Sequence, residues 1–197
     1  MKKGSVVLLV AYLLALPIEA RGTRIAVVSI VRGGGEMVPA LVGGGYVRTC
    51  PVGPEAVSAL REILCRGLER RGGWDLLPLR AQPQEGGEGE LLPWAQEWGE
   101  AIGADLVLLG IVYCWRERIG SALGVERPAE VSLELVLLRV RDGRVLWGKL
   151  VQERQRPLSD DLFKIGRFLK KGFKWLTVRE LAEVVVEEAL RTMPEIQ

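Results

Sequence analysis

The stretch Leu106-Val-Leu-Leu-Gly-Ile-Val-Tyr-Cys-Trp115 decides the fold, because it is apolar at nearly every position. A strand that is apolar on both faces is covered on both faces. Two further strands are predicted over about 129–141 and 144–153. Between them lies Arg141-Asp-Gly-Arg144, and Asp-Gly favours a tight two-residue hairpin turn. An antiparallel sheet is therefore predicted as the core, with Trp147 buried against a helix.

Outward from this core, strand and helix patterns alternate. We predict a strand at 24–31, a helix from Pro54 to the glycines at 72–73, and a short edge strand at 74–79. A second helix starts at Pro93, and the last helix begins at the capping box Thr177-Val-Arg-Glu180. The order β-α-β-α-β-β-β-α predicts an α+β fold, with helices mainly on one face of a mixed sheet. We expect one domain over 21–197, with a connector at 155–176.

Two segments are predicted as loops. The segment 32–45 is rich in glycine but lacks both the Gly-Lys-Ser/Thr and the G-x-G-x-x-G patterns of phosphate-binding loops, so a mobile loop is expected. The segment 116–128 is long for a hairpin loop. It is either a solvated loop or a binding loop.

The amino terminus resembles an export signal. Lys2 and Lys3 precede an apolar run at 6–16, Pro17 ends it, and Ala20 offers a small residue for cleavage. The run is shorter than the about 20 residues that span a bilayer. We predict a signal peptide over 1–20 and a periplasmic or cell-envelope location; the alternative is a buried helix. No cysteine follows the run, so a lipid anchor is not expected there.

Composition excludes several functions. There are 27 Lys and Arg against 25 Asp and Glu, and His is absent. The near-balance of charge argues against nucleic-acid binding. Without His, most metal sites and the usual nucleophile systems are missing, so no metal, cofactor or catalytic residue is predicted.

Three cysteines, Cys50, Cys65 and Cys114, follow the predicted signal. Cys50 and Cys114 could meet at one sheet edge and form a disulfide. We favour the alternative that all three are small buried apolar residues.

Basic side chains gather in two connectors, 116–128 and 164–175. The second combines a basic face with aromatic side chains, and either packs on the domain or binds an acidic partner or an anionic membrane. Arginine and tryptophan are enriched at protein interfaces. The predicted interaction surface consists of Arg116, Arg118, Arg127, Lys164, Arg167, Lys171 and Trp175.

Three stretches carry a family resemblance: Gly103-Ala-Asp-Leu-Val-Leu-Leu-Gly-Ile-Val112, Val131-Ser-Leu-Glu-Leu-Val-Leu-Leu-Arg-Val140 and Asp142-Gly-Arg-Val-Leu-Trp147. They resemble the strands of a group of bacterial envelope domains. The group comprises the amino-terminal domain of TolB, the curli-secretion lipoprotein CsgG and lipoprotein activators of penicillin-binding proteins. The resemblance implies an uncharacterised envelope protein that binds envelope proteins or assembles, without catalytic residues.

The predicted function is therefore a non-catalytic envelope binding or assembly module, whose partner is an envelope protein or a copy of itself. One alternative is an envelope hydrolase, for which Glu117 and Glu126 are the carboxylate candidates. The other alternative is peripheral binding to an anionic membrane surface.

Overall fold

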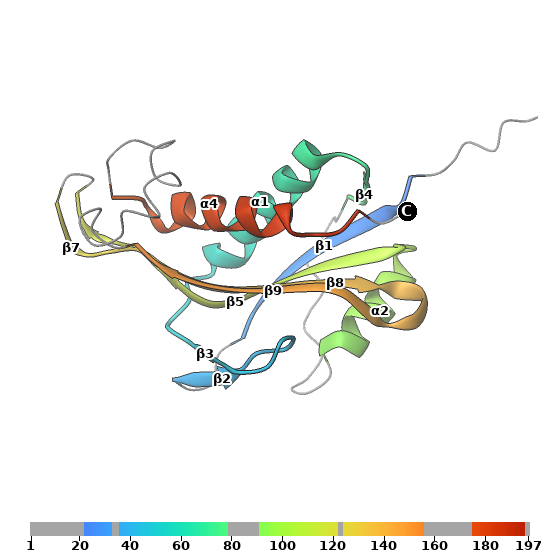
Figure 1. The fold of residues 1–197 in the computed structure, drawn as a ribbon, viewed down its shortest axis with the longest axis horizontal. Coiled ribbons are helices and arrows are strands. Elements are labelled where there is room, and N and C mark those ends of the chain that lie inside the picture. The colour runs from blue at the N-terminus through green and yellow to red at the C-terminus, as the bar shows by residue number, and fades with distance from the viewer. Residues whose placement is uncertain (1–21, 33–35, 79–90, 122–123, 156–174, 196–197) are drawn as a thin grey trace, which may run out of the picture.

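A five-stranded mixed sheet forms the centre of the protein (Figure 1). The computed structural model describes residues 22–32, 36–78, 91–121, 124–155 and 175–195. The strand order is β4-β1-β5-β8-β9, with β1 parallel to β4 and β5, and β8 antiparallel to β5 and β9. The strands are β1 (Arg24–Val31), β4 (Asp75–Leu76), β5 (Leu106–Arg116), β8 (Glu130–Arg139) and β9 (Arg144–Arg154). The predicted α+β fold is confirmed, and the short edge strand lies where it was expected.

Two of the three described helices cover one face of the sheet. Figure 1 shows α1 (Glu55–Arg71) and α4 (Val178–Arg191) above the sheet, and α2 (Leu91–Ala101) below it. Below the sheet also lie the short strands β2 (Met37–Pro39) and β3 (Tyr46–Arg48), which form a separate two-stranded ribbon. None of the described helices combines the length and the apolar character needed to cross a membrane.

Strand β5 is buried from Leu106 to Trp115, as its apolar run predicts. Leu106, Leu108 and Val112 belong to the core under α1 and α4. Val107, Leu109 and Ile111 belong to the core on the other face, with α2 and the ribbon. The strand thus forms the centre of two apolar layers, and burial on both faces explains its lack of polar alternation.

The first motif of the family resemblance joins two strands. Gly103 has a φ of 71°, a left-handed conformation that ends α2. The Asp105 carboxylate then accepts hydrogen bonds from the backbone N–H of Arg24 at 2.9 Å and from its guanidinium at 3.2 Å. The guanidinium holds the pKa of Asp105 below its ordinary value. This contact fixes the starts of β1 and β5 side by side.

Helix α4 begins as its sequence predicts. The Thr177 hydroxyl accepts from the backbone N–H of Glu180 at 3.2 Å, and the Glu180 carboxylate accepts from the N–H of Thr177 at 2.9 Å. This capping box satisfies two N–H groups that lack partners at a helix start. The predicted apolar stripe is buried: Val178, Leu181, Ala182, Val185 and Ala189.

The turn between β8 and β9 differs from the predicted two-residue turn. Arg139 pairs with Arg144, and a 3-10 turn (Val140–Asp142) followed by Gly143 connects them. Only Gly143 has a positive φ, whereas the predicted turn needs two such residues. The Asp142 carboxylate instead binds the Arg139 guanidinium, at 2.6 and 2.9 Å.

Trp147 packs against the core under α4, but it is only half-buried. Its Nε1–H donates to the Thr192 hydroxyl at 3.3 Å. A pairing irregularity beside it places Val145 in the core on the other face. The predicted helix contact is therefore present with less burial than expected, because β9 is an edge strand.

Both segments predicted as loops contain strands. The glycine-rich segment holds β2 and leads into β3, and the segment after β5 holds β6 (Ile119–Gly120) and β7 (Val125–Arg127). Strands β6 and β7 pair with each other and extend the end of the β5–β8 hairpin (Figure 1). The predicted signal peptide, and most of the 155–176 connector, lie outside the described residues.

Candidate interaction surface

The end of β5 has a different neighbour from the rest of the strand. β1 pairs with β5 as far as Val112, and beyond it the segment 50–52 takes its place. The Cys50 N–H donates to the Tyr113 carbonyl at 3.1 Å, and Val52 pairs with Trp115. The pairing of β5 with β8 shifts by one residue at Tyr113. Such bulges redirect side chains: Tyr113 lies in the core on the ribbon side of the sheet, whereas Trp115 lies in the core under α1 and α4, although strict alternation would place it with Tyr113.

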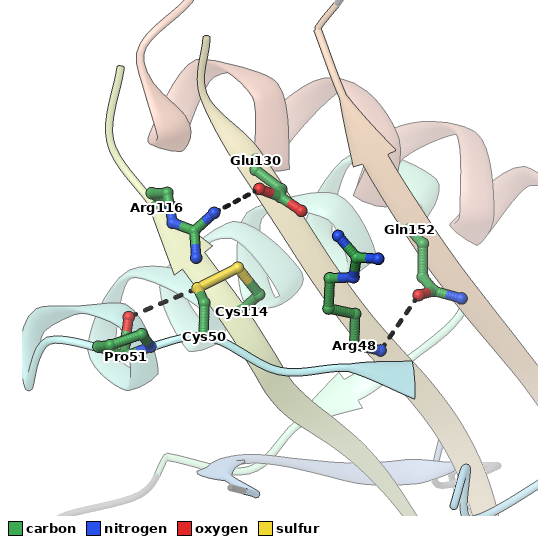
Figure 2. Close-up of a disulfide and its surroundings, with 7 residues drawn as sticks. All are labelled: Arg48, Cys50, Pro51, Cys114, Arg116, Glu130 and Gln152. Atoms are coloured by element: carbon green, nitrogen blue, oxygen red, sulfur yellow. Dashed lines mark hydrogen bonds and ion pairs between the residues drawn. A yellow bond between two sulfur atoms is a disulfide. The ribbon is translucent and has the colours of Figure 1, made fainter. Parts of the chain in front are cut away.

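A disulfide joins Cys50 to Cys114 at this point (Figure 2). Their Cα atoms lie 4.7 Å apart, and the cysteines are 64 residues apart in sequence. This corrects the expectation that all three cysteines are unpaired: the segment 50–52 runs alongside β5, so the two thiols meet. Cys65 is free and half-buried on α1, and burial raises the pKa of its thiol.

The disulfide lies just after β3, and a buried carboxylate binds the chain just after β2. Glu134 of β8 is fully buried and accepts three hydrogen bonds. The donors are the backbone N–H groups of Leu41 at 2.8 Å and Val42 at 2.6 Å, and the Tyr113 hydroxyl at 2.6 Å. Burial, and the hydrogen bond to Glu134, raise the pKa of Tyr113. A buried charge is costly without partners, so these three hydrogen bonds to Glu134 fix the segment that follows β2.

The position of the segment after β2 also explains why the edge strand β9 has a glycine, Gly148. A Cβ atom at Gly148 would lie 2.9 Å from the Val42 side chain. Glycine at this position lets the segment after β2 approach β9 closely. The segment predicted as mobile is therefore attached to both β8 and β9.

The two faces of the ribbon differ sharply. Val47 is fully buried and Val38 packs on the core beneath the sheet. On the opposite face, Met37 is 51% exposed and Tyr46 is 67% exposed, beside exposed Pro39. We call Met37, Pro39 and Tyr46 the ribbon face. Contiguous exposed apolar patches can mark interaction sites, so the ribbon face is a candidate for one.

The structure brings part of the predicted basic surface together. The Arg118 guanidinium donates to the backbone carbonyl of Trp175, and Arg116 forms an ion pair of 2.8 Å with Glu130. Arg127 is exposed on β7. Lys164, Arg167 and Lys171 lie outside the described residues. Two of the arginines thus have structural contacts, and an interaction surface at these positions stays a prediction.

The two carboxylates considered for hydrolysis have different surroundings. Glu117 accepts from the backbone N–H of Val178 at 3.2 Å, at the start of α4, and from that of Arg118 at 2.8 Å. Glu126 is exposed on β7. Glu117 therefore caps a helix, where negative charge is favourable, and a hydrolytic role for Glu117 and Glu126 stays a prediction.

A cleft of about 630 Å³ lies beside the ribbon, at the end of β8 and β9. Side chains of both charges line it, with Trp175 at one wall. Its charged residues are Arg48, Arg154, Glu126, Glu130 and Glu153. Figure 2 shows Arg48 beside β8, with its backbone N–H donating to Gln152 at 3.4 Å. Among the described residues, no three side chains are grouped to hold a metal ion.

Sequence reasoning missed Glu134, Tyr113 and the ribbon face. The signal for Glu134 was present, because it is a lone carboxylate within the apolar strand 131–138. A charge in such a position requires partners. Two of its three partners, the N–H groups of Leu41 and Val42, come from a segment more than 90 residues earlier in the chain.

No protein-family model matches the chain, and no curated protein matches its sequence. Among solved structures, two of a PelC dodecamer from Paraburkholderia phytofirmans have a similar fold. One, of a point variant, is 18% identical and aligns over 87% of both chains with a TM-score of 0.51. The other is 18% identical and aligns over 92% of this chain and 94% of PelC with a TM-score of 0.50.

The LpoB C-terminal domain from Escherichia coli also aligns, over 75% of this chain and 93% of its own length. It is 16% identical, with a TM-score of 0.41. The fold of this chain is therefore an α+β fold shared with PelC. The likeness to TolB and CsgG expected from the sequence stays a prediction.

Proposed function

We propose that this chain is exported to the cell envelope and acts there as a non-catalytic module that assembles with copies of itself. The observation that carries the proposal is the ribbon face, an exposed apolar surface on an anchored ribbon. Fixed apolar and aromatic side chains bind with little loss of conformational entropy. That makes the ribbon suited to a protein partner.

Export is supported by the disulfide. Disulfides persist in oxidising compartments such as the bacterial periplasm and are rare in the reducing cytosol. The Cys50–Cys114 bond therefore agrees with the expected signal peptide over 1–20. The absence of a catalytic role is supported by the contacts of the carboxylates, since Glu134 and Glu117 both stabilise the fold.

Self-assembly is favoured over a different envelope partner by the shared fold. PelC, which has this fold, forms a dodecamer. Binding to an anionic membrane is less favoured, because Arg116 and Arg118 of the predicted basic surface already have partners within the chain.

The test is the molar mass of the purified chain 21–197, with its disulfide formed, measured by sedimentation equilibrium over a range of micromolar concentrations. At the highest concentration we expect a mass that is a whole-number multiple of the monomer mass. On dilution the average mass should fall toward that of the monomer. A monomer at every concentration would contradict self-assembly and would leave a different envelope protein as the partner to be sought.

A further inference from the structure

We propose that the cleft at the end of β8 and β9 binds the carboxylate of a short extended peptide, a site that does not depend on the self-assembly proposed above. Four residues in its lining carry side-chain hydrogen-bond donors: Arg48, Ser132, Gln152 and Arg154. We call these four the cleft donors. The volume of the cleft, about 630 Å³, falls within the range of about 300–1,000 Å³ that small-molecule sites occupy.

Three of the cleft donors lie on one face of the sheet. Ser132 of β8 lies directly opposite Gln152 of β9, and Arg154 follows Gln152 by two residues. Residues two apart on a strand point to the same side. This is the side of the ribbon, since Glu134 of β8 binds the segment after β2. The ribbon supplies the fourth donor: Figure 2 shows Arg48 over β8, with its backbone N–H donating to the Gln152 side-chain oxygen at 3.4 Å.

The donor groups of these side chains have no acceptor within the described part of the chain. Neither Arg48 nor Arg154 forms an ion pair there. Glu130, directly opposite Arg154, is bound to an arginine of β5 at 2.8 Å instead. Ser132 is only 3% exposed, and its hydroxyl makes no hydrogen bond to the described residues. The Gln152 oxygen accepts from β3, which leaves its NH₂ group to donate. The cleft donors therefore require acceptor oxygens from a ligand.

A carboxylate fits this cleft better than a phosphate does. The planar fork of a guanidinium matches the two oxygens of a carboxylate, and such charge-assisted bonds are stronger than neutral ones. The same cleft is also lined by three acidic residues, Glu126, Glu130 and Glu153. A phosphate group carries about 1.5–2 negative charges at pH 7, so these carboxylates repel it more strongly than they repel a ligand carboxylate with one charge.

The edge of β9 favours a peptide over a simpler carboxylate. The Gln155 N–H donates to the Ala129 carbonyl at 3.2 Å, so these two residues form a hydrogen-bonded pair. Such pairs alternate along antiparallel strands, so the backbone groups of Gln152 and Arg154 turn away from β8. β9 is the last strand of the sheet, and no described strand pairs with this edge. An extended peptide can add its backbone here, as peptides do at open sheet edges, while its carboxylate binds the cleft donors.

The experiment is a nuclear magnetic resonance titration of chain 21–197 with its disulfide formed. The probe is N-acetyl-alanyl-alanine with a free carboxyl terminus, and the matched control is the same peptide with a carboxyl-terminal amide. We expect the acid to cause saturable shifts of the amide signals of Gln152 and Arg154. The amide should bind at least about tenfold more weakly, because it lacks the charged acceptor. Acetate should also bind at least about tenfold more weakly, because it has no backbone groups for the edge of β9.

Variants of the two arginines test the cleft donors directly. Arg48→Gln and Arg154→Gln should each weaken binding of the acid by at least about tenfold, since each removes a charged donor. The control Arg144→Gln lies at the other end of β9, outside the cleft, and should change binding by less than about twofold. All three side chains are exposed, so thermal midpoints should stay equal to that of the wild-type chain.

Each negative result overturns a stated part of the proposal. The carboxylate site is overturned if the acid causes no saturable shift, if the amide binds as tightly as the acid, or if all three arginine variants bind the acid alike. Equal binding of acetate and the acid overturns the peptide as the ligand. Tighter binding of inorganic phosphate than of the acid overturns the choice of a carboxylate.

Discussion

Replacing both Cys50 and Cys114 by alanine is expected to lower the free energy of unfolding by about 4 kcal/mol. The bond closes a loop between cysteines 64 residues apart, and the loop entropy removed from the unfolded chain corresponds to about that value. Within the folded state, the same bond holds the segment 50–52 against the end of β5. Both effects are lost together in the variant.

Urea unfolding of the oxidised protein and of the double variant measures this difference. Wild-type protein unfolded under reducing conditions should match the double variant, apart from the small effect of the substitutions. The control is Cys65→Ala, which removes the free thiol on α1 and should cost less than about 1.5 kcal/mol. Equal stability of the oxidised and reduced wild-type protein would show that the bond contributes nothing to the fold.

Glu134→Gln is expected to lower the free energy of unfolding by about 2–4 kcal/mol. All three groups around the carboxylate are donors: two backbone N–H groups and the Tyr113 hydroxyl. A glutamine offers one oxygen, and its NH₂ group faces a donor. A buried donor left without an acceptor costs about 1–3 kcal/mol, and hydrogen bonds to charged groups are stronger than neutral ones.

The matched control for this variant is Glu130→Gln, on the same strand. Glu130 has one arginine partner, Arg116, and the arginine is partly exposed. Its replacement should cost at most about 1 kcal/mol. Urea unfolding compares the two variants, and amide hydrogen exchange at Leu41 and Val42 should accelerate only in Glu134→Gln. Equal loss of stability in both variants would contradict a special role for Glu134.

The features predicted correctly depend on local patterns. The apolar run of β5 predicts burial on both faces whatever its neighbours are, and the Thr177–Glu180 capping box is complete within four residues. The edge position of β4 follows from Pro78, which cannot donate to a sheet. Each of these signals is contained in a short segment, so the sequence alone is enough.

The features that were missed depend on contacts between distant segments. Glycine content indicated a mobile loop at 32–45, but Glu134 and the disulfide fix the chain around it. The Cys50–Cys114 bond follows from the position of the segment 50–52 beside β5, which no local pattern specifies. Two residues of the predicted interaction surface, Arg118 and Trp175, are in contact. The contact is a hydrogen bond from the Arg118 guanidinium to the backbone carbonyl of Trp175.

The most direct test of the account is photo-cross-linking in the cell envelope, with a photoreactive amino acid in place of Tyr46. The side chain is exposed, so the substitution leaves the fold intact, and the same replacement at Ile102 is the control. The account predicts a cross-linked product that contains two copies of this chain, formed at position 46 and absent at position 102. A product that joins the chain only to a different protein, or no product at position 46, would contradict self-assembly through the ribbon face.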